Sequence, residues 1–279
     1  MSVTIITDST ADLPKEIIEE YDIKVLPLTV NFGDRTYRDG VDLTPLQFYE
    51  LLGKSSELPT TSQINPPSFI AAYGEEIKKG NSVVSIHLSS KGSGTYQSAI
   101  IAKNTLDSDK IAVIDSLGYS MGFGIQVLEA ARMAREGAGV QEIENRILAG
   151  RNRMQYIFGV DTLEYLKKGG RLSAARAAIA TVMNIKPILQ VKEGELEVLD
   201  KVRGRKKVIS RIVEIASERG RDLSDQTMAI VHAECLEDAK KLRDMVEERF
   251  NPKEIIISDI GCVIGAHVGP GTLALFFRE

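Results

Sequence analysis

Between residues 68 and 149 the chain alternates segments of helical periodicity with short apolar runs, which are typical of buried strands. The expected elements are a helix over residues 68–79, a strand over 83–88, a helix over 94–106, a strand over 111–114 and helices within 120–149. Strands that alternate with helices usually pair in parallel beneath those helices. The N-terminal half therefore predicts a mostly parallel, helix-covered sheet.

Local signals upstream of this region extend the same pattern. Asp12 and Pro14 predict the start of a short helix, and Thr44 begins another through a capping box. Pro27 interrupts a β-rich stretch, so we expect an edge strand or a bend there, because proline cannot donate to a sheet ladder. A loop is expected over residues 53–67.

From residue 156 onward the pattern changes. Apolar and polar residues alternate in the two segments that flank Glu193 and Gly194. This pattern predicts an antiparallel hairpin with one solvent-exposed face. Helix and strand patterns then follow one another to the C-terminus. We therefore expect an α/β fold of two domains, residues 1–155 with a mostly parallel sheet and residues 156–279 with a mixed sheet.

Composition excludes several classes of protein. The 279 residues are 43% hydrophobic, which excludes a globally disordered chain, and the net charge of −4 gives no overall attraction to nucleic acid or anionic membranes. No apolar stretch reaches the roughly 18 residues of a spanning helix, and no signal peptide is recognisable, so a cytoplasmic location is expected. Cys235 and Cys262 match no metal spacing, so we expect reduced thiols, no metal and no cofactor.

The segment that follows the strand at 83–88 is rich in glycine and serine. Gly92 and Gly94 permit positive φ angles and close backbone approach. A helix that starts near Gly94 or Thr95 presents amides without intrahelical partners, which favour a carboxylate or phosphate. The segment therefore predicts a small-anion site.

Three other polar clusters, residues 8–10, 59–63 and 265–271, also lie at expected strand ends or loops, where open sheets bind ligands. His267 is expected in the last of these loops, where it would reach a cleft, donate to a carboxylate and titrate near neutrality. His87 and His232 lie within strands and are expected to be core histidines.

A covalent enzyme is the competing interpretation. Ser93 lies in a glycine turn, and His267 would act as a base with Asp259 or Asp161 as its orienter. The nucleophile-elbow pattern is absent, however, because Lys91 replaces its first glycine. Hydroxyl-rich loops with free amides favour holding an anion. The alternative that remains open is a stand-alone enzyme on a phosphorylated or carboxylated metabolite, with His267 as the acid–base group.

Residues 201–207 form a basic run, and Arg171 and Arg176 are further basic residues. Nucleic-acid recognition would need more basic area and usually aromatic residues, and this run has none. We expect a docking patch for a partner or for phosphate.

Taken in order, these segments resemble the DegV family of bacterial fatty-acid-binding proteins, which includes the carrier subunits of fatty acid kinase. The segments that carry the resemblance are residues 5–14 (IITDSTADLP), 59–63 (PTTSQ), 93–99 (SGTYQSA), 161–172 (DTLEYLKKGGRL), 186–189 (KPIL), 203–207 (RGRKK) and 264–271 (IGAHVGPG). The chain departs from the family at Lys91 and Gly92, where an apolar residue and a serine are common.

The resemblance implies the DegV fold, with a long-chain fatty acid such as palmitate between two α/β domains and its tail in an apolar tunnel. Thr61 and Ser93 would hold the carboxylate. The implied neighbours in that network are Ser62, the Gly94 amide and His267. Arg171 and Arg203 would lie near the opening, where a fatty acid kinase catalytic subunit docks and phosphorylates the carboxylate. The chain itself would be a carrier without catalytic residues.

Overall fold

The computed structural model describes residues 2–172 and 184–279. The first of its two main sheets has the strand order β2-β1-β6-β7, with every neighbouring pair parallel. Its strands are β1 (Val3–Asp8), β2 (Lys24–Leu26), β6 (Ser82–His87) and β7 (Ile111–Asp115). The predicted parallel sheet is confirmed, and β2, which precedes Pro27, is an edge strand as expected.

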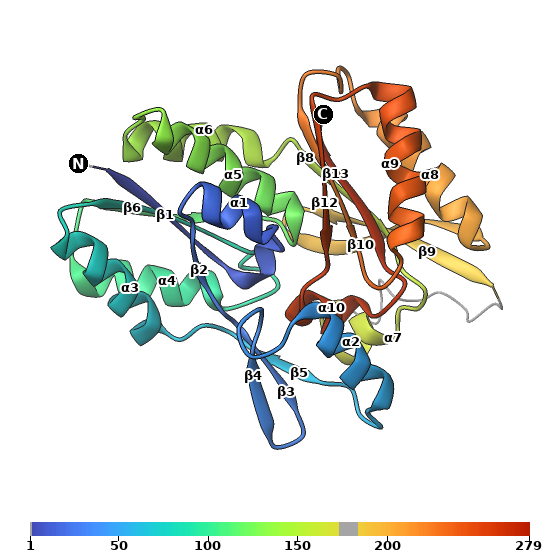
Figure 1. Cartoon of the computed structure of the whole chain (residues 1–279), viewed down its shortest axis with the longest axis horizontal. Helices are drawn as coiled ribbons and strands as arrows, with labels where there is room; N and C mark the ends of the chain where they lie inside the picture. The colour runs from blue at the N-terminus through green and yellow to red at the C-terminus, as the bar shows by residue number, and fades with distance from the viewer. Residues whose placement is uncertain (1, 173–183) are drawn as a thin grey trace.

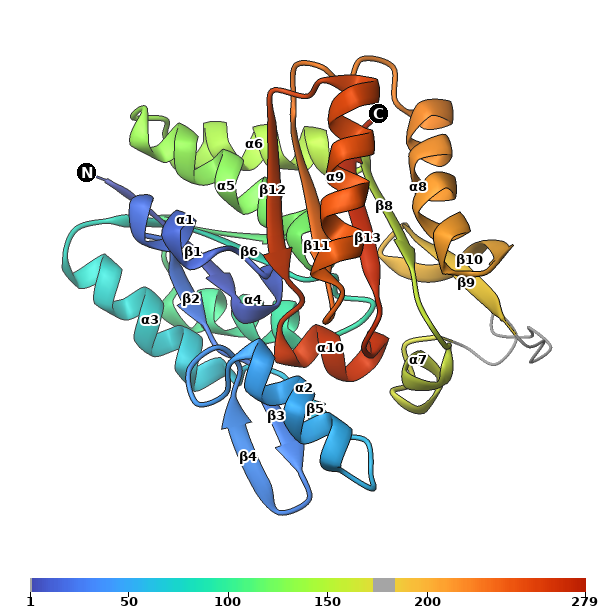
Figure 2. The same ribbon diagram turned by 45° about the vertical axis from the view of Figure 1, so that its right-hand side comes forward.

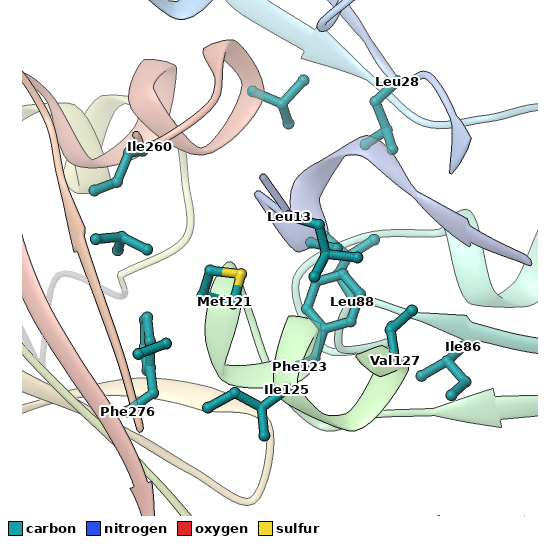
Figure 3. Packing of buried hydrophobic residues seen from close by; sticks show 14 of the residues in the cluster. Leu13, Leu28, Ile86, Leu88, Met121, Phe123, Ile125, Val127, Ile260 and Phe276 are labelled. Carbon is teal, nitrogen blue, oxygen red and sulfur yellow. The ribbon is translucent and has the colours of Figure 1, made fainter. Parts of the chain in front are cut away.

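Helices cover both faces of this sheet (Figure 1). They are α3 (Pro66–Lys78) and α4 (Thr95–Leu106) on one face, and α5 (Met121–Arg135) and α6 (Val140–Arg151) on the other. Helix α5 also contacts the second sheet, so it is buried between the two (Figure 3). Among the described residues, no helix is both long and apolar enough to cross a membrane.

The second main sheet is mixed, in the order β10-β9-β8-β13-β11-β12. Its strands are β8 (Met154–Gly159), β9 (Ile185–Lys192), β10 (Glu195–Arg203), β11 (Thr227–His232), β12 (Glu254–Asp259) and β13 (Leu273–Arg278). Strands β9 and β10 form the predicted antiparallel hairpin. Helices α8 (Arg205–Arg219) and α9 (Leu236–Phe250) pack on one face. The apolar core on the other face of this sheet is continuous with the core of the first sheet. The predicted domain boundary near residue 155 therefore stays a prediction.

A third, antiparallel sheet was not predicted from the sequence. Its order is β4-β3-β5, and its strands are β3 (Thr29–Phe32), β4 (Arg35–Arg38) and β5 (Thr60–Ser62). The expected loop over residues 53–67 is therefore wrong at β5, a three-residue polar strand that forms only because β3 pairs with it. The remaining N-terminal helices are η1 (Ser9–Ala11), α1 (Lys15–Glu20) and α2 (Pro45–Lys54), whose capping box at Thr44 is confirmed.

Helix α10 (Cys262–Val268) replaces the expected loop around His267. It lies below the ends of β12 and β13, beside α2, and also contacts α7 (Glu164–Lys168) (Figure 2). Its first amides bond to two carboxyl groups from the N-terminal half: Gly261 N donates to Asp12 Oδ1 and Cys262 N donates to Asp39 Oδ1, both at 3.0 Å. Asp12 therefore caps α10, which is distant in the sequence. The prediction that Asp12 marks the start of α1 is wrong, because its side chain does not cap that helix.

Both of these carboxyl groups are buried. Burial raises the pKa of Asp12 well above its ordinary value, and the nearby Asp39 raises it further, although hydrogen bonds from Ser120 and Gly261 act in the opposite direction. A carboxyl pKa that is higher in the folded than in the unfolded state stabilises the fold at low pH, and that contribution is lost as pH rises.

We therefore expect Asp12→Asn to be at least as stable as the unmodified chain at pH 8, because its amide oxygen can still accept from Gly261 N and its amide nitrogen can donate to Ser120 Oγ, without a buried charge. Asp12→Ala leaves the Gly261 amide unpaired and should lower the free energy of unfolding by about 1–3 kcal/mol. Urea denaturation of the three proteins at pH 6 and pH 8 measures this. Equal destabilisation by both substitutions at pH 8 would contradict the assignment.

Candidate functional site

An apolar cavity of about 330 Å³ lies between the two main sheets, within the size range of small-molecule sites. Its apolar wall is formed mainly by the second sheet, by α10 and by two leucines of the N-terminal half. Representative residues are Phe158, Ala274, Phe276, Val263, Leu28 and Leu88. Figure 3 shows Leu28, Leu88 and Phe276 around this region, with Met121 of α5 between the sheets. No aspartate or glutamate is among the described residues that line the cavity.

Hydrogen-bonding groups gather where β5, α10 and the start of α4 meet the cavity. Thr61 on β5 and His267 on α10 lie 206 positions apart, and Thr61 Oγ1 is 2.9 Å from His267 Nε2. Ser93 and Gly94, directly before α4, line the same cavity. The structure thus brings together Thr61, Ser93, Gly94 and His267, all of which were predicted from the sequence.

The imidazole of His267 is held in a tight, poorly solvated place. A Cβ at Gly169 would collide with His267 Nδ1, so the backbone of that glycine packs directly on the ring. Burial, together with the nearby positive charge of Arg171, lowers the pKa of His267 to about 4. The expectation of a histidine that titrates near neutrality is therefore wrong, because the ring is neutral at pH 7.

The geometry also contradicts the predicted catalytic arrangement around His267. Within the described residues, His267 Nδ1 has no hydrogen-bond partner, so neither Asp259 nor Asp161 orients the ring. Ser93 Oγ instead contacts Thr95 Oγ1 at 3.0 Å and accepts from Thr95 N at 3.2 Å. The nucleophile–base hydrogen bond that covalent catalysis needs is not formed between Ser93 and His267.

Gly94 contributes an exposed backbone donor to the cavity. Among the described residues, its amide has no hydrogen-bond acceptor. The expected positive φ is wrong, since φ is −77° at Gly94 and Gly92 is not among the positive-φ glycines. The close approach is confirmed, because a Cβ at Gly94 would collide with the amide of Gln63 and one at Gly92 with Tyr119.

Neighbouring side chains of residues 61–63 make different contacts because they alternate in direction along β5. Both residues line the cavity, but the Ser62 hydroxyl accepts a hydrogen bond from Asn31 Nδ2 at 3.2 Å on the exposed side of β5. Gln63 Nε2 donates to Ser98 Oγ at 3.0 Å, which ties β5 to α4. Gln63 was not predicted as a site residue, and only the alternation of side chains along a recognised strand could have separated Thr61 from Ser62.

A second, polar cavity of about 710 Å³ adjoins the first, and we call it the outer cleft. Thr61, Arg171 and His267 line both cavities. Arg171 is exposed and donates to the carbonyls of Gly92 and Gly169, so it lies at the rim of the apolar cavity. Arg203 is exposed at the end of β10, and Arg176 lies outside the described residues.

The other histidines are core residues, as predicted. His87 is fully buried, with Nδ1 3.0 Å from Asp8 Oδ2 and Nε2 2.7 Å from Ser85 Oγ. This resembles a catalytic triad, but no member lines a described cavity. His232 is 6% exposed on β11. Across residues 2–172 and 184–279, no group of three or more His, Cys, Asp or Glu side chains could hold a metal ion.

The comparisons with known proteins agree with this architecture. The model of the family described as "Uncharacterised protein, DegV family" matches residues 2–279. A DegV domain-containing protein from Caldanaerobacter subterraneus is 40% identical over 99% of each chain. The protein DegV of Bacillus subtilis is 37% identical over 99% of this chain and 98% of that protein.

Solved structures extend the likeness to the whole fold. A fatty-acid-binding DegV family protein from Thermus thermophilus superimposes with a TM-score of 0.93 at 32% identity, covering 100% of both chains. DegV of Bacillus subtilis, described as a fatty acid binding protein, gives a TM-score of 0.90 at 36% identity, again over 100% of both chains. Family model, relatives and fold agree over nearly every residue, and the chain therefore belongs to the DegV family.

Proposed function

We propose that this chain is a cytoplasmic carrier that binds a long-chain fatty acid such as palmitate, with the tail in the apolar cavity and the carboxylate at Thr61 and Ser93. The observation that carries the proposal is an apolar cavity with hydrogen-bond donors at one end and no acidic side chain among the described residues that line it. Fatty acid binding by the Thermus thermophilus and Bacillus subtilis proteins supports the same ligand class.

The tautomer of His267 determines what Thr61 offers to a carboxylate. A buried N–H without an acceptor is rarer in proteins than a buried acceptor without a donor. Since Nδ1 has no partner in the described residues, the single ring proton is better placed on Nε2, where it donates to Thr61 Oγ1. The hydroxyl proton of Thr61 is then free to donate to the ligand, beside the Gly94 amide and the Ser93 hydroxyl.

Tail and head group contribute differently to binding. Burial of about 0.8 kcal/mol per methylene gives a sixteen-carbon chain a gross gain of about 12 kcal/mol before ordering costs. Each hydrogen bond to the carboxylate contributes about 1.5–3 kcal/mol, with desolvation acting against it. The tail therefore dominates affinity, and the polar end fixes the position of the carboxylate.

The outer cleft gives that carboxylate a route to a second protein. Because Thr61 and His267 line both cavities, a head group held there faces the cleft, with Arg171 at its rim. We infer that a fatty acid kinase catalytic subunit docks near Arg171 and Arg203 and transfers phosphate from ATP to the carboxylate, which places the chain in fatty acid metabolism or lipid transport. In this proposal the carrier supplies no catalytic residue. A His267 with a pKa of about 4 is a weak general base and has no imidazolium proton to donate at pH 7, which disfavours the stand-alone enzyme.

We expect Thr61→Val to weaken palmitate binding about tenfold, because it removes one hydrogen bond to a charged group while preserving the shape of the residue. Thr60→Val is the matched control, since Thr60 is exposed next to Thr61 on β5 and should leave affinity unchanged. Equilibrium displacement of a fluorescent fatty acid measures both. Unchanged affinity in Thr61→Val, or an equal loss in both variants, would contradict the head-group assignment.

Palmitate affinity should also be nearly constant between pH 8 and pH 6. A histidine with the ordinary pKa of 6.5 would gain positive charge over this interval and bind a carboxylate more tightly at pH 6. Because the folded pKa is about 4, the ring stays neutral and no proton is taken up. The same displacement assay tests this, and a rise in affinity at pH 6 that is absent in His267→Gln would show that the imidazolium binds the ligand.

A further inference from the structure

The end of the apolar cavity away from His267 also carries polar groups. Thr272 precedes β13 and bonds back to α10, and Phe276 lies four residues later. At about 3.3 Å per residue, Phe276 is about 13 Å farther along the cavity wall. Tyr156 pairs with Phe276 across β8 and β13, with ring centroids 5.6 Å apart. Tyr156 therefore lies beside the part of the cavity wall that is farthest along β13 from Thr272, which we call the distal end.

The hydroxyl of Tyr156 has a proton without an acceptor. Gln126 Nε2 donates to Tyr156 Oη at 3.1 Å and to the carbonyl of Ser116 at 3.3 Å, and that carbonyl can only accept, which fixes the orientation of the amide. Tyr156 thus accepts from Gln126. Among the described residues, its own O–H donates to no partner, although the side chain is only 3% exposed.

Behind Tyr156 lies a polar depression of about 600 Å³, which we call the distal depression. Tyr156 and Val191 line both this depression and the apolar cavity, so they form the wall between the two. The distal depression is lined by three cations, Arg151, Lys192 and Arg219, and by one carboxylate, Glu193.

The two arginines bind neutral acceptors. Arg151 donates to the carbonyl of Asp115 and Arg219 donates to the amide of Gln155, and among the described residues neither forms an ion pair with a carboxylate and the buried Nε of Arg151 has no hydrogen-bond partner. Arg151 and Arg219 are half-buried and Lys192 is exposed, and cations gathered around a depression favour an anion. Against a terminal methyl group, the Tyr156 hydroxyl would remain an unsatisfied donor, which is unfavourable for a buried group.

We propose that the distal end is a second polar subsite, which takes an ω-carboxylate and so admits long-chain α,ω-dicarboxylic acids. This inference rests on the proposed function, because it requires the acyl chain to fill the cavity with its first carboxylate at Thr61. The second carboxylate accepts from Tyr156 where the cavity meets the distal depression, and the cations offset its charge.

The test compares hexadecanedioate with hexadecanoate by equilibrium displacement on the full chain. The unmodified protein should bind the two acids within about tenfold of each other, and Tyr156→Phe should weaken the dioate about tenfold more than the monoacid. Tyr119→Phe is the matched control, because Tyr119 also lines the cavity but its hydroxyl donates to Gly194 O, so any loss should be equal for both acids.

Charge is tested separately, with a substitution that leaves the cavity wall intact. Lys192→Gln should weaken the dioate selectively, whereas Lys253→Gln, at an exposed lysine outside both cavities, should not. Two results would overturn the second subsite and leave the proposed function intact. One is that the unmodified protein binds the dioate more than about tenfold more weakly than the monoacid, and the other is that Tyr156→Phe weakens both acids equally. If neither acid binds, the proposed function fails together with it.

Discussion

The contact of α10 with the N-terminal half is the constraint on which the site depends. Asp12 and Asp39 accept from the first amides of α10, and Tyr49 donates to the carbonyl of Ile260 just before it. Helix α10 forms one wall of the apolar cavity and carries His267 against Thr61. A few buried polar contacts between residues more than 200 positions apart therefore fix both the shape of the cavity and the geometry of its polar end.

The polar end is made of neutral donors, and this suits a carrier. A buried cation beside the carboxylate would bind it strongly but would oppose its release and its reaction with a second protein. In the proposed complex, the Thr61 and Ser93 hydroxyls and the Gly94 amide would orient the carboxylate, the neutral His267 would hold Thr61, and most of the affinity would come from the tail. Arg171, the charged residue nearest this end, stays at the exposed rim and bonds to backbone carbonyls.

Local sequence signals predicted most of the fold and the polar clusters, whereas the individual residues of the polar end came from the resemblance to the DegV family. The alternation of strands and helices predicted the parallel sheet, and the residues of the polar end were named individually. The errors arise where distant partners decide local structure. His267 lies on a helix because Asp12 and Asp39 cap that helix, and Thr61 lies on a strand because β3 pairs with it. The cavity itself collects residues from elements throughout the chain, so no local pattern could reveal it.

The most direct test of the central claim, that the cavity holds an acyl chain, is denaturing extraction of the purified protein followed by mass spectrometry. Tail burial of the size expected here should retain ligand through purification. The account predicts close to one long-chain acid per protein, with a chain of about 16–18 carbons. A protein that yields no lipid and also fails to take up added palmitate, or one that yields a phosphorylated metabolite instead, would contradict it.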